Sequence, residues 1–181
     1  MSPTPETIIA DTRRWLEQAV IGLNLCPFAR AVYVKNQVRI VVSSARHIDA
    51  FLDDLDRELA HLQAVSAEET DTTLLIHPTL FPDFFVFNDF QGVVDEVLQE
   101  HELEGVIQVA HFHPDFVFDG EPDGDMSHFT NRAPYPILHL LREDSVARAV
   151  DSAGGDAEQI VERNIRTLRD LGPEGWKRLV G

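Results

Sequence analysis

The sequence has little of what marks several common classes of protein. A single cysteine, Cys26, excludes an internal disulfide framework and a cysteine-rich zinc site. No apolar run approaches the roughly 18 residues that cross a bilayer, and the N-terminal segment lacks the basic and then apolar order of a signal peptide. We therefore expect a cytoplasmic protein of bacterial type, with no contact to a membrane.

Positive charge is also scarce. Lys and Arg number 15 against 31 Asp and Glu, which gives a formal net charge of -16. A polyphosphate would be repelled by such a chain at long range, and no Lys/Arg cluster offers a local basic groove. We therefore expect no nucleic-acid partner, and we interpret the excess acid as a solvated surface that favours solubility.

The glycine-rich motifs of nucleotide sites are missing. The chain contains neither G-x-x-x-x-G-K-[ST] nor G-x-G-x-x-G, and the G-x-S-x-G turn of many hydrolases is absent too. The loop "DGEPDGD" starts like an EF-hand, with Asp119, Glu121 and Asp123 at alternate positions. Its twelfth position is Thr130, where calcium needs a bidentate glutamate. An acidic surface turn is the better interpretation.

What is present is an ordinary globular composition, with 44% hydrophobic and 25% charged residues. A chain of 181 residues suffices for one domain that buries roughly 70% of its unfolded surface, and we expect a single domain over residues 1–181. Apolar spacing, capping residues and turn residues indicate alternating helices and strands. The expected elements are a helix from Pro5 to near Gly22, a β-hairpin of strands 31–34 and 38–43, a helix capped by Ser44, a strand over 72–77, a helix around 87–98, strands over 104–113 and 135–141, and C-terminal helices from Asp144 and from Asp156.

This order of elements predicts an α/β (α+β) two-layer sandwich, with the ferredoxin-like arrangement as one form of it. An additional N-terminal helix and the C-terminal helices would be added to that sandwich. A helix bundle or an all-β barrel fits the alternation less well.

The strand over 104–113 ends in a group of metal-binding side-chain types. Because side chains alternate along a strand, His111 and His113 share a face, and Asp115 follows in the order H-x-H-x-D. Two neutral imidazoles and a carboxylate suit zinc or another divalent metal. In the alternative interpretation, one histidine is hydrogen-bonded under the following loop and the other is solvated. No other cofactor is indicated.

The segment "NRAPYPILHLLRE" offers anion-binding groups. Two prolines stiffen the turn that holds Asn131 and Arg132, and a stiff polar turn can position a ligand. Arg132 and Arg142 each have the planar fork that binds a carboxylate or phosphate. Salt bridges to nearby acids are the alternative for both arginines. His139 lies within an apolar strand, where it is either a ligand-binding group or a core histidine with a satisfied hydrogen bond.

Cys26 follows the first helix in "GLNLCPFA". A lone cysteine is commonly a small buried hydrophobic residue. To act as a nucleophile, it needs a cation or a base such as His113 beside its thiolate.

Three segments carry a resemblance to a known family. "GLNLCPFA", "FHPDFVFDG" and "TNRAPYPILHLLREDSV" resemble the hallmark segments of DUF1415, a family of uncharacterised bacterial proteins, and the similarity runs over nearly the whole chain. The resemblance implies that Cys26, His113, Asn131, Arg132, His139 and Arg142 are the positions of interest. It argues against His111 as a metal ligand, because that family more typically has a small residue there, and it implies no activity.

Three functional hypotheses follow. The leading one is an enzyme that transfers or hydrolyses an acyl-type group of a small anionic metabolite, with Cys26 as nucleophile and His113 as acid or base; Asn131, Arg132, His139 and Arg142 would bind the substrate. The second is a metal-binding hydrolase that uses His111, His113 and Asp115. The third is a non-catalytic ligand-binding or regulatory module, which could form a homo-oligomer through its sheet. The first hypothesis requires the thiol, the imidazole and the guanidinium groups to line one cavity.

Overall fold

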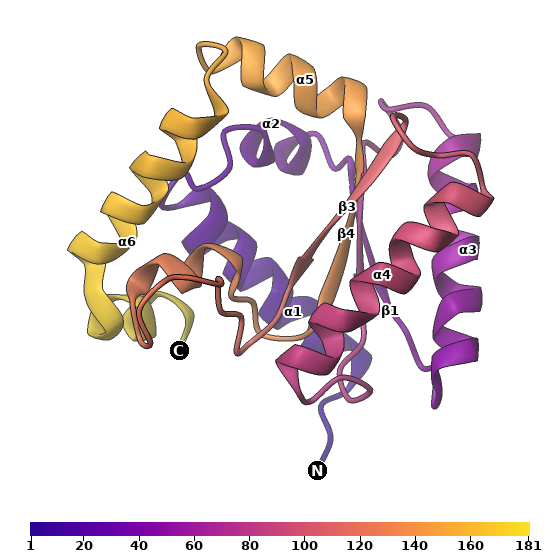
Figure 1. The fold of residues 1–181 in the computed structure, drawn as a ribbon, viewed down its shortest axis with the longest axis horizontal. Helices are drawn as coiled ribbons and strands as arrows, with labels where there is room; N and C mark the ends of the chain where they lie inside the picture. The colour runs from indigo at the N-terminus through magenta and orange to yellow at the C-terminus, as the bar shows by residue number, and fades with distance from the viewer.

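All four strands form one mixed sheet in the order β1-β2-β4-β3, in a computed structural model that describes residues 1–181 (Figure 1). β1 pairs parallel with β2, whereas β4 pairs antiparallel with both β2 and β3. The elements are α1 (Pro5–Trp15), a π-helical turn η1 (Leu16–Ile21), α2 (Ala29–Val34), β1 (Val38–Val42), α3 (Ile48–Ala64), β2 (Thr72–Ile76), α4 (Phe84–Glu100), β3 (Ile107–Phe112), a 3-10 helix η2 (Met126–Asn131), β4 (Ile137–Arg142), α5 (Glu143–Ser152) and α6 (Ala157–Val180).

Local capping explains where several helices begin. The Thr4 side chain accepts a hydrogen bond from the Thr7 N–H at 3.3 Å, and Pro5 occupies the first turn. Asp83 caps α4 by accepting from two N–H groups, and Asp156 caps α6 in the same way. These side chains satisfy N–H groups that the helix itself leaves free.

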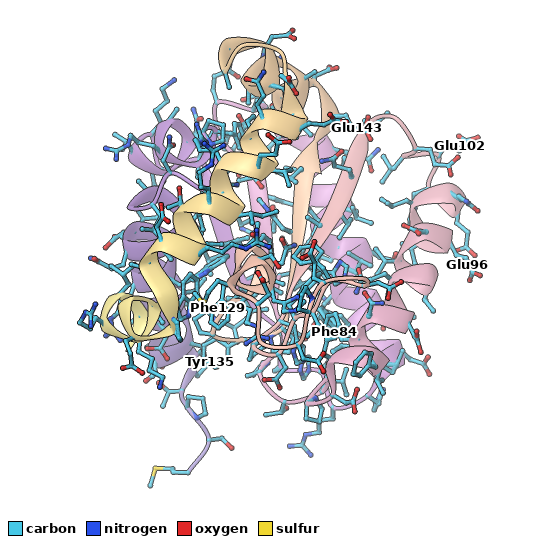
Figure 2. The ribbon with its side chains drawn as sticks, turned by 60° about the vertical axis from the view of Figure 1, so that its left-hand side comes forward. Phe84, Glu96, Glu102, Phe129, Tyr135 and Glu143 are labelled. Carbon is cyan, nitrogen blue, oxygen red and sulfur yellow. The ribbon has the colours of Figure 1, made fainter.

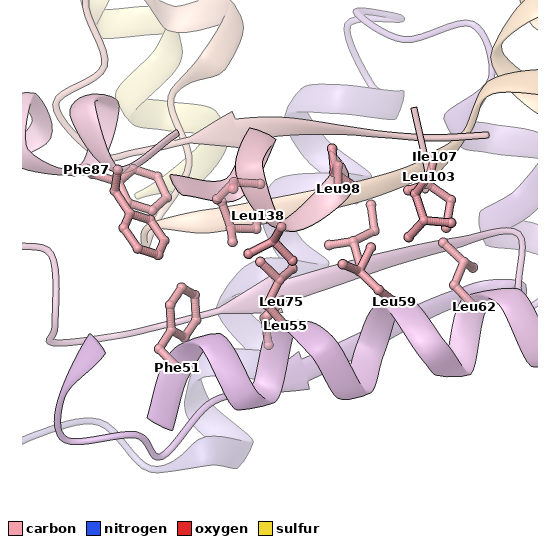
Figure 3. Packing of buried hydrophobic residues seen from close by; sticks show 14 of the residues in the cluster. Phe51, Leu55, Leu59, Leu62, Leu75, Phe87, Leu98, Leu103, Ile107 and Leu138 are labelled. Carbon is pink, nitrogen blue, oxygen red and sulfur yellow. The ribbon is translucent and has the colours of Figure 1, made fainter. Parts of the chain in front are cut away.

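Helices α3 and α4 cover one face of the sheet (Figure 1). The apolar stripe of α3 recurs every three or four residues and points at the strands, as Figure 3 shows. The side chains of this core that Figure 3 labels are Phe51, Leu55, Leu59, Leu62, Leu75, Phe87, Leu98, Leu103, Ile107 and Leu138.

The opposite face packs against the two ends of the chain. Trp15, Ala19 and Leu168, from α1, η1 and α6, are buried against Ile76 and Ile137 of the sheet. The C-terminal part of α6 also contacts η2, where Phe129 lies 5.2 Å from Trp176 between ring centroids (Figure 2). The α2, α5 and α6 helices lie around the remainder of this face.

The mixed α/β class with extra terminal helices is confirmed. The sheet with α3 and α4 forms the two-layer unit, and the terminal helices add a layer on the other face. Its element order is β-α-β-α-β-β, which differs from the β-α-β-β-α-β order of a ferredoxin-like fold. One sheet joins all the strands, in keeping with the single domain expected for residues 1–181. None of the helices is both long enough and apolar enough to span a bilayer.

The expected hairpin around residues 35–37 is wrong. Residues 29–34 form α2 instead of a strand, and β1 pairs parallel with the fully buried β2. A hairpin needs a strand on each side of its turn, so the helical residues 29–34 exclude it. Ser44 does not cap α3, which begins at Ile48 after His47; the neighbouring Ser43 hydroxyl hydrogen-bonds Asp54 at 2.6 Å.

Candidate functional site

An apolar cavity of about 380 Å³ lies between the sheet and α2, α5 and α6. This volume falls in the range of roughly 300–1,000 Å³ that small-molecule sites occupy. None of its 27 lining residues is Asp, Glu, Lys or Arg, although the chain carries a net charge of -16. The cavity is therefore an uncharged compartment within a strongly acidic protein.

Alternation along the strands builds the sheet side of the cavity. Residues two apart on one strand point to the same face, so each strand contributes a short series of every second residue. The contributed residues are Val38 of β1, Thr72 and Leu74 of β2, Gln108, Ala110 and Phe112 of β3, and His139 and Leu141 of β4.

Helices α5 and α6 cover the other side, and α6 is hydrogen-bonded to the segment before α2. The Asn164 amide donates to the Leu25 carbonyl at 2.6 Å, and Arg163 donates to the Asn24 carbonyl at 3.1 Å. The turn between α5 and α6 has two consecutive glycines at positive φ, a backbone conformation that other residues rarely adopt. The lining residues from these two helices are Val146, Ala149, Val150, Ala157, Ile160 and Val161.

His139 is a polar group of the cavity whose hydrogen bond fixes which ring nitrogen carries the hydrogen. Its Nε2 lies 2.6 Å from the Thr72 hydroxyl, which also donates to the Leu140 carbonyl at 2.8 Å. A hydroxyl has one proton, so both bonds form together only when Nε2 carries a hydrogen and Thr72 accepts it. Burial lowers the pKa of His139 to about 4, and the ring is therefore neutral at pH 7.

Cys26 lines the same cavity and is half-buried. Burial raises the pKa of its thiol, and this effect outweighs the backbone N–H groups of Phe28 and Ala29, which lower it. At neutral pH the sulfur is thus a thiol, the opposite of what an activated nucleophile requires. The base expected for it, His113, is not among the lining residues, whereas His139 is.

His113 lies on the opposite face of the sheet, against α4. Its Nε2 donates to the Phe81 carbonyl at 2.8 Å, and its Nδ1 accepts from the Asp115 N–H at 3.0 Å. The ring is buried between Phe84 and Phe87. Both nitrogens are therefore occupied by main-chain groups, and the ring does not reach the cavity that Cys26 lines.

The expected metal site is not formed. No three His, Cys, Asp or Glu side chains are placed to hold a metal ion. His111 bonds to the Asn88 side chain at 3.0 Å, whereas both nitrogens of His113 bind main chain. Asp115, in the turn after Pro114, is exposed. Burial lowers the pKa of Arg132, and the negative charge of Asp115 acts in the opposite direction. The alternative interpretation, a histidine hydrogen-bonded under the loop, describes His113.

The two arginines bind main-chain carbonyls rather than a common anion. Arg132 Nε donates to the Phe116 carbonyl at 3.0 Å, and its guanidinium lies 4.4 Å from the centre of the Phe129 ring. Arg142 Nη2 is 2.8–2.9 Å from three carbonyl oxygens at the C-terminal end of α3 and beyond. Neither residue lines the cavity, so the expected anion-binding pair is not brought together.

Asn131 does line the cavity, at the junction of η2 and the sheet. Its side-chain amide donates to the His111 carbonyl at 3.0 Å, and its own carbonyl accepts from the His113 N–H. Of the six positions implied by the family resemblance, the cavity thus gathers Cys26, Asn131 and His139.

Sequence reasoning missed Thr72 and Gln108. The strand "TTLLI" begins with two threonines, and a polar residue within a buried strand needs a hydrogen-bond partner. That requirement was the only available indication that Thr72 would pair with a side chain on a neighbouring strand.

The comparisons with known proteins identify the family. Neither the curated proteins nor the solved structures gave a match to this chain. A family described as a protein of unknown function, DUF1415, has a model that matches residues 7–178. The match runs from α1 into the last turns of α6 and includes every element that lines the cavity. The chain therefore belongs to the DUF1415 family.

Proposed function

We propose that this protein binds a small, uncharged, largely apolar molecule in the cavity between its sheet and α2, α5 and α6. The observation that carries the proposal is the lining of the cavity: of 27 residues, 21 are hydrophobic and none is charged. Burying apolar ligand surface contributes about 25 cal/mol per Å², and this lining offers a predominantly apolar surface for such burial.

An anion is a poor ligand for the cavity. Bringing a charge into an apolar site is costly unless an opposite charge or hydrogen-bond donors compensate for the lost hydration. The arginines expected in that role, Arg132 and Arg142, lie outside the lining and bind carbonyl oxygens. The proposal therefore extends the ligand-binding hypothesis and replaces a small anionic metabolite with a neutral one.

The proposal is tested with N-phenyl-1-naphthylamine, an uncharged apolar dye whose fluorescence rises in a dry site. We expect one dye molecule per chain to bind saturably to the wild-type protein. Ala149→Phe places a ring in the cavity from α5 and should weaken dye binding at least tenfold.

Ala147→Phe is the matched control, because Ala147 is on the same helix but is exposed and does not line the cavity. It should bind the dye as the wild type does. Dye binding that does not saturate, or that Ala149→Phe and Ala147→Phe affect equally, would contradict the proposal.

A further inference from the structure

We infer that the ligand carries a hydrogen-bond donor, a hydroxyl group of an apolar alcohol or phenol, and that this donor binds Nδ1 of His139. The inference rests on the proposed function and adds the class of polar group that the cavity selects.

The orientation of the His139 ring is set by β2. Nε2 is held 2.6 Å from the Thr72 hydroxyl, and that hydroxyl has the Leu140 carbonyl as its own acceptor at 2.8 Å. The hydrogen therefore resides on Nε2. Nδ1 then has a lone pair, and it can only accept a hydrogen bond.

The structure gives Nδ1 no partner within the protein. The bond to Thr72 is the one hydrogen bond of the His139 side chain, and its ring lines the cavity while Phe112 packs 6.0 Å away between ring centroids. Because Nε2 is turned toward Thr72, Nδ1 is the nitrogen left for a ligand. A half-buried acceptor without a partner is costly to dehydrate, so a donor from the ligand improves binding.

The surroundings keep the ring neutral. The other titratable groups of the lining are Cys26 and Tyr33, and no carboxylate lines the cavity that could stabilise an imidazolium. Burial also lowers the pKa of His139. A neutral Nδ1 accepts a hydrogen bond from an O–H group. An ionised carboxylate or phosphate oxygen has no hydrogen to donate, so its lone pair would repel the lone pair of Nδ1.

Three ligands of similar ring size separate these possibilities by isothermal titration calorimetry at pH 7.5. They are 1-naphthol, which has a donor; 1-methoxynaphthalene, which has only an acceptor; and 1-naphthoate, which is an anion. One hydrogen bond predicts that 1-naphthol binds roughly 5- to 10-fold more tightly than 1-methoxynaphthalene. The anion should bind most weakly of the three.

Variants locate the donor site. His139→Phe keeps an aromatic ring but removes the acceptor, so the two neutral ligands should bind within about twofold of each other. His47→Phe changes an exposed histidine at the start of α3 and should keep the wild-type ratio.

Equal binding of both neutral ligands to the wild type, or a preference for 1-naphthoate, would overturn the inference and leave the proposed cavity function standing. Failure of all three ligands to bind would overturn both. The wild-type comparison decides the matter even if His139→Phe fails to fold.

Discussion

Histidines of the same intrinsic chemistry differ in this protein because each ring meets different partners. His77 bonds the Ala45 carbonyl through Nε2 and two main-chain N–H groups through Nδ1, and His113 likewise uses both nitrogens. These two rings fasten loops to the sheet. His139 uses only one nitrogen, and its ring faces a cavity. A ring nitrogen without a hydrogen-bond partner, more than the residue type, distinguishes a histidine that can bind a ligand.

The reactivity of the Cys26 thiol is a second property that depends on the surroundings of a single residue. Because burial raises its pKa and reaction with iodoacetamide requires the thiolate, we expect alkylation at pH 8 to be several-fold slower than for a free thiol such as glutathione. A ligand that fills the cavity should slow the reaction further, since Cys26 lines it. The rate is measured by mass spectrometry of the intact chain.

A Cys26 that reacts faster than glutathione would contradict this prediction and would revive the thiol-enzyme hypothesis. Urea-unfolded protein is the internal control, because its thiol should react at the rate of an ordinary cysteine.

At the scale of elements, Arg142 joins the end of β4 to the end of α3. Its Nη2 donates to the carbonyls of Leu62, Val65 and Thr70, two of which belong to the C-terminal end of α3. A helix leaves its last carbonyls without intrahelical partners, and a guanidinium there also suits the helix dipole. Arg142 is thus a structural connection between the sheet and one helical layer.

Arg142→Met should therefore lower the free energy of unfolding by about 2–3 kcal/mol, because buried carbonyls lose a charged donor. Binding of N-phenyl-1-naphthylamine by the folded fraction should stay unchanged, since Arg142 does not line the cavity. Urea denaturation followed by circular dichroism measures the first effect and dye titration the second.

Arg57→Met is the control, because Arg57 forms an exposed pair with Asp54 on α3 and should change stability by less than about 1 kcal/mol. Loss of dye binding in folded Arg142→Met would instead place Arg142 in the binding machinery.

At the scale of the whole molecule, most charge lies at the surface, and the buried Glu58 carboxylate is paired with Arg39 at 2.7 Å. Glu96, Glu102 and Glu143 project at the periphery (Figure 2), whereas the cavity has no charged lining residue. The neutral histidines inside make the fold sensitive to acid, because protonating them requires a charge in an apolar environment.

We expect stability to fall as the pH decreases from about 6.5 to 4. The pKa of His139 is about 4 in the folded protein and near 6.5 when unfolded, so the unfolded chain binds more protons in this interval. The stability that the neutral His139 preserves is fully present above pH 6.5 and is lost as the pH falls; this loss reaches about 3 kcal/mol by pH 4. Burial lowers the pKa of His77 and His111 in the same direction.

Urea denaturation at pH 7.5, 6, 5 and 4 measures this dependence. His139→Phe should show a smaller loss of stability across the series than the wild type, and His47→Phe the same loss. If the free energy of unfolding falls equally with pH in the wild type and in His139→Phe, the result would contradict a neutral, buried His139.

The fold class and much of the element order were predictable from the sequence because their causes are local. The apolar stripe from Phe51 to Leu62 fits one face of a helix, and Thr4 and Asp156 cap helices through N–H groups two or three residues away. Strand β2 is buried at every position because both of its faces are covered. Over such short distances, neighbouring residues decide the structure.

The site was only partly predictable. Cys26, Asn131 and His139 were identified from the family segments and do line one cavity, whereas His113, Arg132 and Arg142 were expected there and lie elsewhere. Nothing within "HFHPD" or "LHLLRE" tells which face of the sheet a strand presents to which helix.

Local sequence was enough to predict the starts of α1 and α6, the buried strand β2 and the membership of a family. That His111 and His113 face α4 while His139 faces the cavity depends on how the strands pair and which layer covers each face of the sheet. The pleat is the cause: β3 and β4 pair so that neighbouring residues on one strand point to opposite layers. Partners for a ring nitrogen or a guanidinium then come from residues far away in the chain, such as Leu62 for Arg142, 80 positions away, and Asn24 for Arg163, 139 positions away.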